Sequence, residues 1–135
     1  MTSLMSKIGM QYMSKEAPLA IYHVFAGIAV ADYESALAWY ERMMGRPPDL
    51  KPQENEAAWQ LTDTGWFYIV RDTNRAGKAL VTIMVNDLEE LVASLREEGL
   101  ETPAIETLPG LYRKVVITDP DGNMISFGED LSMDG

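Results

Sequence analysis

Two segments of this chain, 55 residues apart, share the pattern of a short apolar stretch followed by an acidic residue. They cover residues 27–34 (GIAVADYE) and 82–89 (TIMVNDLE). In the second, Val81, Ile83 and Val85 alternate with Leu80, Thr82 and Met84, so that one face is β-branched throughout, with the period of two that is typical of a strand. Asp32 and Asp87 then occupy the position of a helix N-cap. An internal repeat of this kind restricts the chain to folds built from two similar units.

Each segment continues into a predicted helix with one apolar face: Tyr33, Ala36, Leu37, Tyr40 and Met44 in the first, and Leu88, Leu91, Val92 and Leu95 in the second. Gly45 and Gly99 are the expected helix ends. Three strand-like stretches follow each helix: 49–55, 57–62 and 66–71, then 104–108, 112–118 and 123–128. Asp63-Thr64-Gly65 and Asp119-Pro120-Asp121-Gly122 supply turns.

The order strand, helix and three strands therefore occurs twice, which predicts an α+β fold of two tandem βαβββ modules. We expect one domain over residues 18–130, with module one at about 20–72 and module two at about 79–130. Residues 72–79 would link the modules. Residues 1–17 show no sustained period and are expected to form a flexible arm, and residues 131–135 a short tail.

Composition removes several function classes. The 135 residues include 11 Lys and Arg, 21 Asp and Glu, and no Cys, so the net charge is −10. A disulfide framework, a thiolate nucleophile and a Cys-ligated zinc site are excluded. The sequence pI of 4.4 argues against nucleic acid as a partner. The acidity could attract a cationic ligand, or it could only keep an ordinary surface soluble.

Residues 18–31 (PLAIYHVFAGIAVA) form an apolar run that ends like a signal-peptidase site. The run is too short to span a bilayer, Glu16 precedes it, and a cut after Ala31 would delete the first strand of the repeat. We therefore expect a cytoplasmic protein with no membrane partner.

Three segments carry a resemblance to a known family: GIAVADYESALAWYERMMG at 27–45, TIMVNDLEELVASLREEG at 82–99 and YRKVVITDPDGNMISF at 112–127. Over residues 20–130 the chain resembles the vicinal oxygen chelate superfamily, which holds glyoxalase I, extradiol dioxygenases and bleomycin-resistance proteins. The resemblance implies eight strands that curl into a half-open β-barrel with a helix outside each module. It also implies a ligand cavity, commonly formed or completed in a homodimer.

Metal-binding members of this superfamily carry one ligand seven residues before each helix-capping acid and a Glu on the last strand of each module. Those positions are Phe25, Leu80, Ser126 and either Ile69 or, with a register shift of one, Tyr68. A transition metal needs about three or four N, O or S ligands. We therefore predict no metal and no cofactor, and no metal-dependent glyoxalase or dioxygenase activity.

The same positions predict an apolar ligand site with a few hydroxyl groups. Its expected lining is Phe25, Gln60, Phe67, Ile69, Leu80, Thr82, Met84, Arg113, Met124 and Ser126. Arg113 would pair with Asp119 or with an anionic ligand. His23 is the one candidate catalytic group, as a general base, although a hydrogen-bonded histidine at a strand end is the simpler interpretation. Asp119 and Asp121 are expected to bond the backbone of their own turn.

The favoured function is a metal-independent small-molecule binding protein of the glyoxalase and bleomycin-resistance type. Its ligand would be a hydrophobic or cationic aromatic compound, and the protein would form a homodimer. Two alternatives stay open: a metal-free isomerase or lyase of the same superfamily, and a protein interaction module whose barrel is filled by its own side chains.

Overall fold

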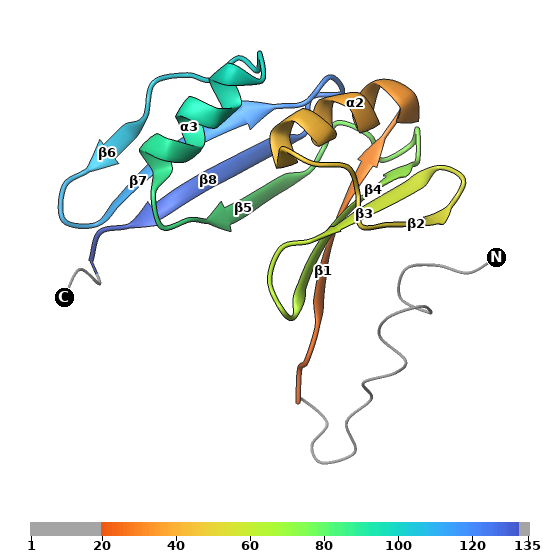
Figure 1. Cartoon of the computed structure of the whole chain (residues 1–135), viewed down its shortest axis with the longest axis horizontal. Helices are drawn as coiled ribbons and strands as arrows, with labels where there is room; N and C mark the ends of the chain where they lie inside the picture. Colours follow the sequence, from red (N-terminus) through yellow and green to blue (C-terminus); the bar gives the residue numbers. More distant parts are fainter. Residues whose placement is uncertain (1–19, 133–135) are drawn as a thin grey trace.

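The computed structural model describes residues 20–132, in which two four-stranded sheets each carry one helix (Figure 1). This is the predicted α+β class. The arm predicted at residues 1–17 lies outside the described residues, as do residues 133–135 of the predicted tail. No helix within residues 20–132 has the length and apolar character needed to cross a membrane.

The elements follow the predicted order. The first half contains β1 (Val24–Val30), α2 (Tyr33–Met44), β2 (Leu50–Gln53), β3 (Glu56–Gln60) and β4 (Gly65–Arg71). The second half contains β5 (Leu80–Met84), α3 (Leu88–Glu97), β6 (Glu106–Leu108), β7 (Tyr112–Thr118) and β8 (Met124–Asp130). The strands predicted after each helix lie within a few residues of their observed positions, because alternation and turn residues are local signals.

Both helices begin where the acidic residues were expected to cap them. Oδ1 of Asp32 accepts a hydrogen bond from the Ser35 backbone N–H at 3.2 Å, and Oδ1 of Asp87 accepts one from Glu90 at 3.1 Å. These carboxylates satisfy backbone donors that have no partner within the helix. Gly45 ends α2 with φ of 75°, a conformation that residues with a side chain rarely adopt.

The two sheets have corresponding strand orders, β1-β4-β3-β2 and β5-β8-β7-β6. The first strand of each half pairs in parallel with the last, and the other pairs are antiparallel. Within residues 20–132 the sheets remain separate and do not close into a barrel. The expected half-open barrel is therefore not made by strand pairing in this chain, and the two tandem modules around one cavity stay a prediction.

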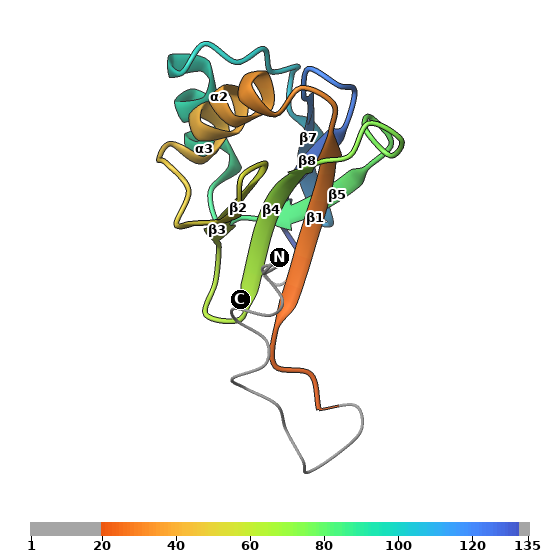
Figure 2. The ribbon, with the colours of Figure 1, turned by 90° about the vertical axis from the view of Figure 1, so that its right-hand side faces the viewer.

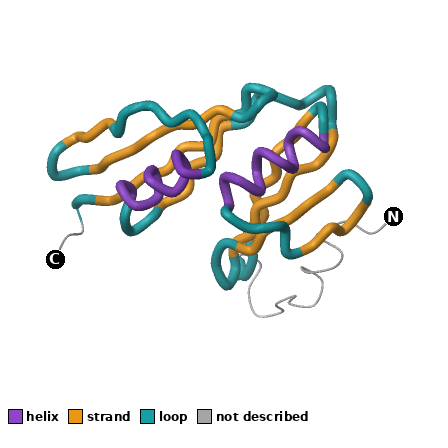
Figure 3. Tube along the Cα trace, turned by 45° about the horizontal axis from the view of Figure 1, so that its top comes forward, coloured by secondary structure: helices purple, strands orange, loops and turns teal. Residues whose placement is uncertain are grey.

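Each helix packs against one face of its own sheet, and both helices lie on the same side of the molecule (Figure 2, Figure 3). Residues from both halves form one hydrophobic core beneath them, including Tyr40, Trp59 and Phe67 from the first half and Leu95 and Phe127 from the second. No helix within the described residues covers the opposite face of either sheet. We call these surfaces the first open face and the second open face.

The turn before β8 holds the two halves together. Oδ1 of Asp119 accepts hydrogen bonds from the backbone N–H groups of Asp121 and Asn123, both at 2.9 Å, as expected for a turn. Its Oδ2 accepts one from the Tyr40 hydroxyl of α2 at 2.7 Å. Asn123 donates to the carbonyl of Ala29, and Asp121 accepts from the N–H of Ala31. This turn therefore links the second half of the chain to the end of β1 as well as stabilising itself.

The Tyr40 to Asp119 hydrogen bond is fully enclosed. Burial raises the pKa of the Tyr40 phenol well above its usual range, and the hydrogen bond to Asp119 raises it further. Tyr40 therefore stays protonated and remains a donor at any physiological pH.

Candidate functional site

The second open face is an apolar surface with a hollow of about 540 Å³. Alternation along β5 and into the next residue places Val81, Ile83 and Val85 against the core and sends the intervening side chains outward. Leu80 is 63% exposed, Met84 59% and Met124 43%. Such large apolar side chains gathered around one hollow are typical of a binding surface.

Strands β5, β7 and β8 line the hollow with Leu80, Thr82, Met84, Tyr112, Arg113, Lys114, Val116, Met124, Ser126 and Gly128. No Asp or Glu among the described residues belongs to this lining. Register explains this grouping, because Leu80 pairs with Met124 and Thr82 with Ser126 across the parallel strands. Gly128 leaves space that the Met84 thioether occupies, since a Cβ there would lie 3.0 Å from Met84 Sδ.

The first open face is filled by its own aromatic side chains. Ala58 and Trp66 are buried there, and Phe25, Leu50 and Tyr68 pack against them. Tyr68 lies across Gly27, where a Cβ would be 2.5 Å from its Cζ and 2.6 Å from its Oη. Gly27 is therefore needed for this close approach. The buried Trp66 Nε1–H has no hydrogen-bond acceptor among the described residues.

The structure brings together six of the ten residues of the predicted lining, Arg113 among them. Leu80, Thr82, Met84, Met124 and Ser126 share the second open face. Phe25 lies on the first open face, and Gln60 is at the end of β3, where its Nε2 donates to the Asp63 carbonyl at 3.3 Å.

The predicted orientation of Phe67 and Ile69 is wrong. Both are completely buried in the core on the helix side of the first sheet. The alternative register, one residue earlier, is the correct one, and it puts Tyr68 on the open face. Tyr68 pairs with Gly27 in the first sheet as Ser126 pairs with Thr82 in the second. The one-residue error exchanges faces because side chains alternate along a strand.

Arg113 belongs to the lining of the hollow, but its guanidinium group forms an ion pair on the opposite side of the sheet, where α3 lies. Its Nη1 forms an ion pair with Glu89 of α3 at 3.3 Å, and the expected pairing with Asp119 is wrong, since Asp119 is bonded to Tyr40, Asn123 and its own turn. Lys114 and Tyr112 also line the hollow, and neither is in the lining expected from the sequence. Strand alternation with Val116, two residues further along β7, could have placed both on the open face.

His23 immediately precedes β1 and is half-buried. Its ring centre lies 5.5 Å from that of Tyr22 and 6.0 Å from that of Phe25. Both of these neighbours are aromatic side chains, and the role of His23 as a general base stays a prediction.

The residues present do not fit a divalent transition metal. The positions that correspond to metal ligands hold Phe25, Tyr68, Leu80 and Ser126, which offer two hydroxyl groups and two hydrocarbon side chains. Among residues 20–132 there is no group of three His, Asp or Glu side chains that could hold a metal ion. A zinc or iron site would need three or four nitrogen, carboxylate or thiolate ligands here.

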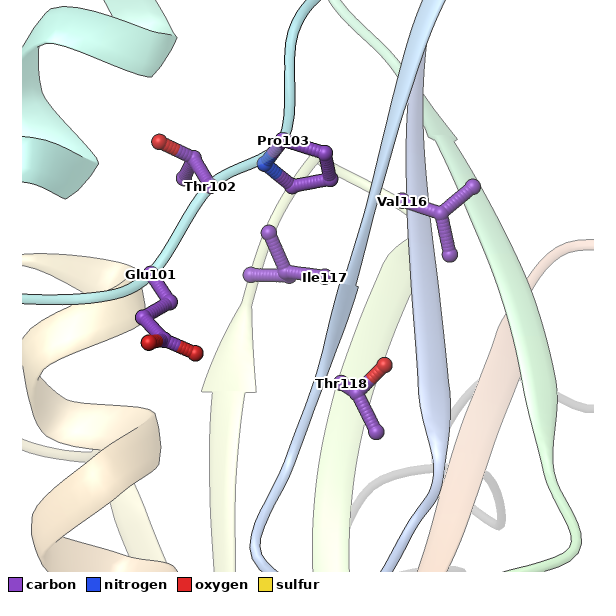
Figure 4. Close-up of a pocket in the computed structure, with 6 residues that line it drawn as sticks. All are labelled: Glu101, Thr102, Pro103, Val116, Ile117 and Thr118. Atoms are coloured by element: carbon purple, nitrogen blue, oxygen red, sulfur yellow. The ribbon is translucent and has the colours of Figure 1, made fainter.

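A second hollow, of about 460 Å³, opens at the edge of β7 (Figure 4). It lies between residues 101–103 and Val116, Ile117 and Thr118. Strand β6 pairs with β7 only as far as Lys114, so the rest of β7 has an open edge there.

Comparison with known proteins agrees with this architecture. The sequence model of the Glyoxalase/Bleomycin resistance protein/Dioxygenase superfamily matches residues 20–127. No curated protein matches the chain. A glyoxalase / bleomycin resistance protein from Catenulispora acidiphila DSM 44928 is 43% identical, with a TM-score of 0.76, and the match covers 79% of this chain and 96% of that one.

Two more distant structures share the fold. TnmS3, an antibiotic binding protein from Streptomyces sp. CB03234, is 22% identical with a TM-score of 0.66, and the match covers 83% of this chain and 98% of TnmS3. A lactoylglutathione lyase from Agrobacterium tumefaciens is 16% identical with a TM-score of 0.68, and the match covers 88% and 100% of the two chains. The predicted resemblance is confirmed at the level of the family: the chain belongs to the Glyoxalase/Bleomycin resistance protein/Dioxygenase superfamily.

Proposed function

We propose that this protein binds small organic molecules without a metal, and that the ligand lies in the hollow of the second open face. The observation that carries the proposal is the exposed group of Leu80, Met84 and Met124 around a cavity of about 540 Å³. Covering these side chains with an apolar ligand removes hydrocarbon surface from water, at about 25 cal/mol per Å². The cavity volume is in the range of small-molecule sites.

The names of two relatives support a binding function. TnmS3 is described as an antibiotic binding protein, and the 43% identical relative as a glyoxalase / bleomycin resistance protein. The side chains at the metal-ligand positions favour binding over metal-dependent chemistry, because Phe25 and Leu80 have no donor atoms. The first open face is largely filled by aromatic side chains, and the smaller hollow of about 350 Å³ that reaches Gly27 and Ala29 has the polar residues Asn74, Arg75 and Lys78 on its other side, so we place the ligand in the second half.

We also propose that two copies complete the half-open barrel as a homodimer. Exposed apolar side chains are not confined to the hollow, since Val24, at the start of β1, is 61% exposed and Ile21, just before it, is 78% exposed. A second copy would cover such residues and enclose a ligand more fully than one sheet face can. Light scattering after size-exclusion chromatography should give twice the 15.1 kDa of the chain.

Binding is tested with the neutral fluorescent probe N-phenyl-1-naphthylamine and the full chain. We expect saturable fluorescence enhancement that is unchanged by dialysis against EDTA. Thr82→Glu places a charge in the hollow and should weaken probe binding at least tenfold. Ala93→Glu adds the same charge on the exposed side of α3 and should have no effect. Equal binding by native protein and Thr82→Glu would contradict the proposed site, and loss of binding with EDTA would contradict metal independence.

A further inference from the structure

The hollow carries a local charge opposite to that of the whole protein. Among residues 20–132, the charged residues that line it are Arg113 and Lys114 alone. Arg113 is bound to Glu89 on the helix side of the sheet. Lys114 lies on the open face between Tyr112 and Val116, and no ion pair among the described residues engages it. The net charge of −10 therefore says little about the ligand that this surface prefers.

The neighbours of Lys114 leave its ammonium group available. Its Nζ lies 5.9 Å from the centre of the Tyr112 ring, a cation-π distance that leaves other N–H donors free. On one side Lys114 pairs with Gly128, which has no side chain, and on the other with Glu106 of β6. Glu106 is exposed to water and forms no ion pair with Lys114. Asp130, two residues beyond Gly128 on β8, pairs with Tyr112.

The uncharged polar side chains that line the hollow suit an anion or a neutral ligand, and Glu106 and Asp130, which share this face by strand pairing, lie outside the lining. The Thr82 and Ser126 hydroxyls face each other across β5 and β8 and can donate hydrogen bonds. Leu80, Met84 and Met124 supply the apolar part of the surface. A cationic ligand would find no carboxylate in the lining and one ammonium group that repels it.

We propose that the ligand is a small organic anion: an apolar body covered by Leu80, Met84 and Met124, and one carboxylate, sulfonate or phosphate group that accepts hydrogen bonds from Lys114 Nζ. This inference rests on the proposed function, since it gives the chemical class of the ligand for the same hollow. It replaces the cationic aromatic ligand that net charge alone favours, because the charge within a few ångströms decides the contact, and charges further than about 10 Å are largely screened.

The test uses two probes with the same aromatic skeleton. 1-Anilinonaphthalene-8-sulfonate carries a sulfonate, and N-phenyl-1-naphthylamine does not. Lys114→Met keeps most of the hydrocarbon chain and removes the charge. We expect it to weaken binding of the sulfonate probe about three- to tenfold, as loss of a partly exposed charged hydrogen bond would, and to leave the neutral probe within twofold. Lys114→Arg should retain the sulfonate probe.

Lys51→Met is the matched control, since Lys51 is exposed on β2 in the first half, and it should change neither affinity. Equal losses for both probes in Lys114→Met would assign Lys114 a packing role and overturn the inference while the binding function stands. An unchanged affinity of Lys114→Met for the sulfonate probe would overturn it as well. If neither probe binds the native protein at all, the proposed function fails, and the ligand class fails with it.

Discussion

The two open faces are built on the same register and differ in nearly every side chain. Phe25, Trp66 and Tyr68 of the first face correspond to Leu80, Met124 and Ser126 of the second. Gly27 lies opposite Tyr68, whereas Thr82 lies opposite Ser126. In the first face the large ring of Tyr68 occupies the space above a glycine, so the surface closes on itself. In the second face two small hydroxyl residues meet, so a hollow remains.

The two open faces also differ in the charged residue that they carry at matching positions. Glu56 pairs with Val70 in the first sheet, and Lys114 pairs with Gly128 at the matching place in the second. Glu56 is 4% exposed and accepts a hydrogen bond from Gln53 Nε2 at 3.1 Å, so it is used internally. Lys114 is half-buried and has no ion-pair partner among the described residues. One backbone plan thus yields a structural face and a binding face, depending on a few side chains.

The largest predicted effect comes from breaking the contact that holds the two halves together. Asp119→Ala removes the acceptor for Tyr40 Oη, Asn123 Nδ2 and two backbone N–H groups. Because these donors are buried, the free energy of unfolding should fall by about 3 to 5 kcal/mol. Chemical denaturation measures the loss. Asp63→Ala, in the exposed turn of the first half, is the control and should cost under about 0.5 kcal/mol; a comparable loss there would contradict the distinction between the two turns.

The second prediction concerns the filling of the first open face. Gly27→Ala places a methyl group against the Tyr68 ring and should cost about 1 to 3 kcal/mol of stability. In a Tyr68→Ser background, which copies the residue of the second face, the same change should cost little. The difference between the two costs is the coupling energy of a double-mutant cycle. Additive effects would show that Tyr68 does not fix the identity of residue 27.

The third prediction transfers the filled face to the second half. Thr82→Gly with Ser126→Tyr copies the Gly27 and Tyr68 pair at the matching positions and should close the hollow. We expect binding of N-phenyl-1-naphthylamine to weaken about tenfold, which corresponds to about 1.4 kcal/mol. Thr82→Gly alone is the control, because it enlarges the hollow and should retain the probe. Full binding by the double variant would place the ligand elsewhere.

Short-range sequence patterns were enough to predict the order of helices and strands, whereas the residues that face the site depend on which strands pair. Strand alternation, the N-caps at Asp32 and Asp87 and the turn at Asp119 are short-range patterns, and the structure confirms them. The facing of Phe67 and Ile69 was wrong because β4 contains five apolar residues in a row, from Trp66 to Val70, and such a run has no readable alternation. Its register follows only from pairing with β1. The hydrogen bond from Tyr40 to Asp119 spans 79 positions and leaves no sequence signal.

The smallest predicted effect concerns the loops that follow the two helices. After α2, Oδ2 of Asp49 accepts hydrogen bonds from Arg46 Nη1 and from the Gln60 backbone N–H, both at 2.7 Å, and so ties the loop to β3. After α3, no backbone hydrogen bond among the described residues joins residues 101–105 to the edge of β7. That edge borders the hollow of Figure 4. The loop after α2 is therefore tied to its sheet by Asp49, whereas a hollow separates the loop after α3 from β7.

This difference has a pH signature. The hydrogen bond from Arg46 lowers the pKa of Asp49 below its usual 3.8, and the bond from the Gln60 backbone lowers it further. A carboxylate with a lowered pKa in the folded state stabilises the protein above its unfolded pKa, and the contribution is lost as the pH falls through the folded value. Because both side chains are about 40% exposed, the contribution should be no more than about 0.5 kcal/mol. Asp49→Asn should therefore lower stability slightly at about pH 6, and its difference from the native protein should shrink as the pH falls below 3.8. A difference between the two proteins that stays constant below that pH would mean that Asp49 acts through its shape and not its charge.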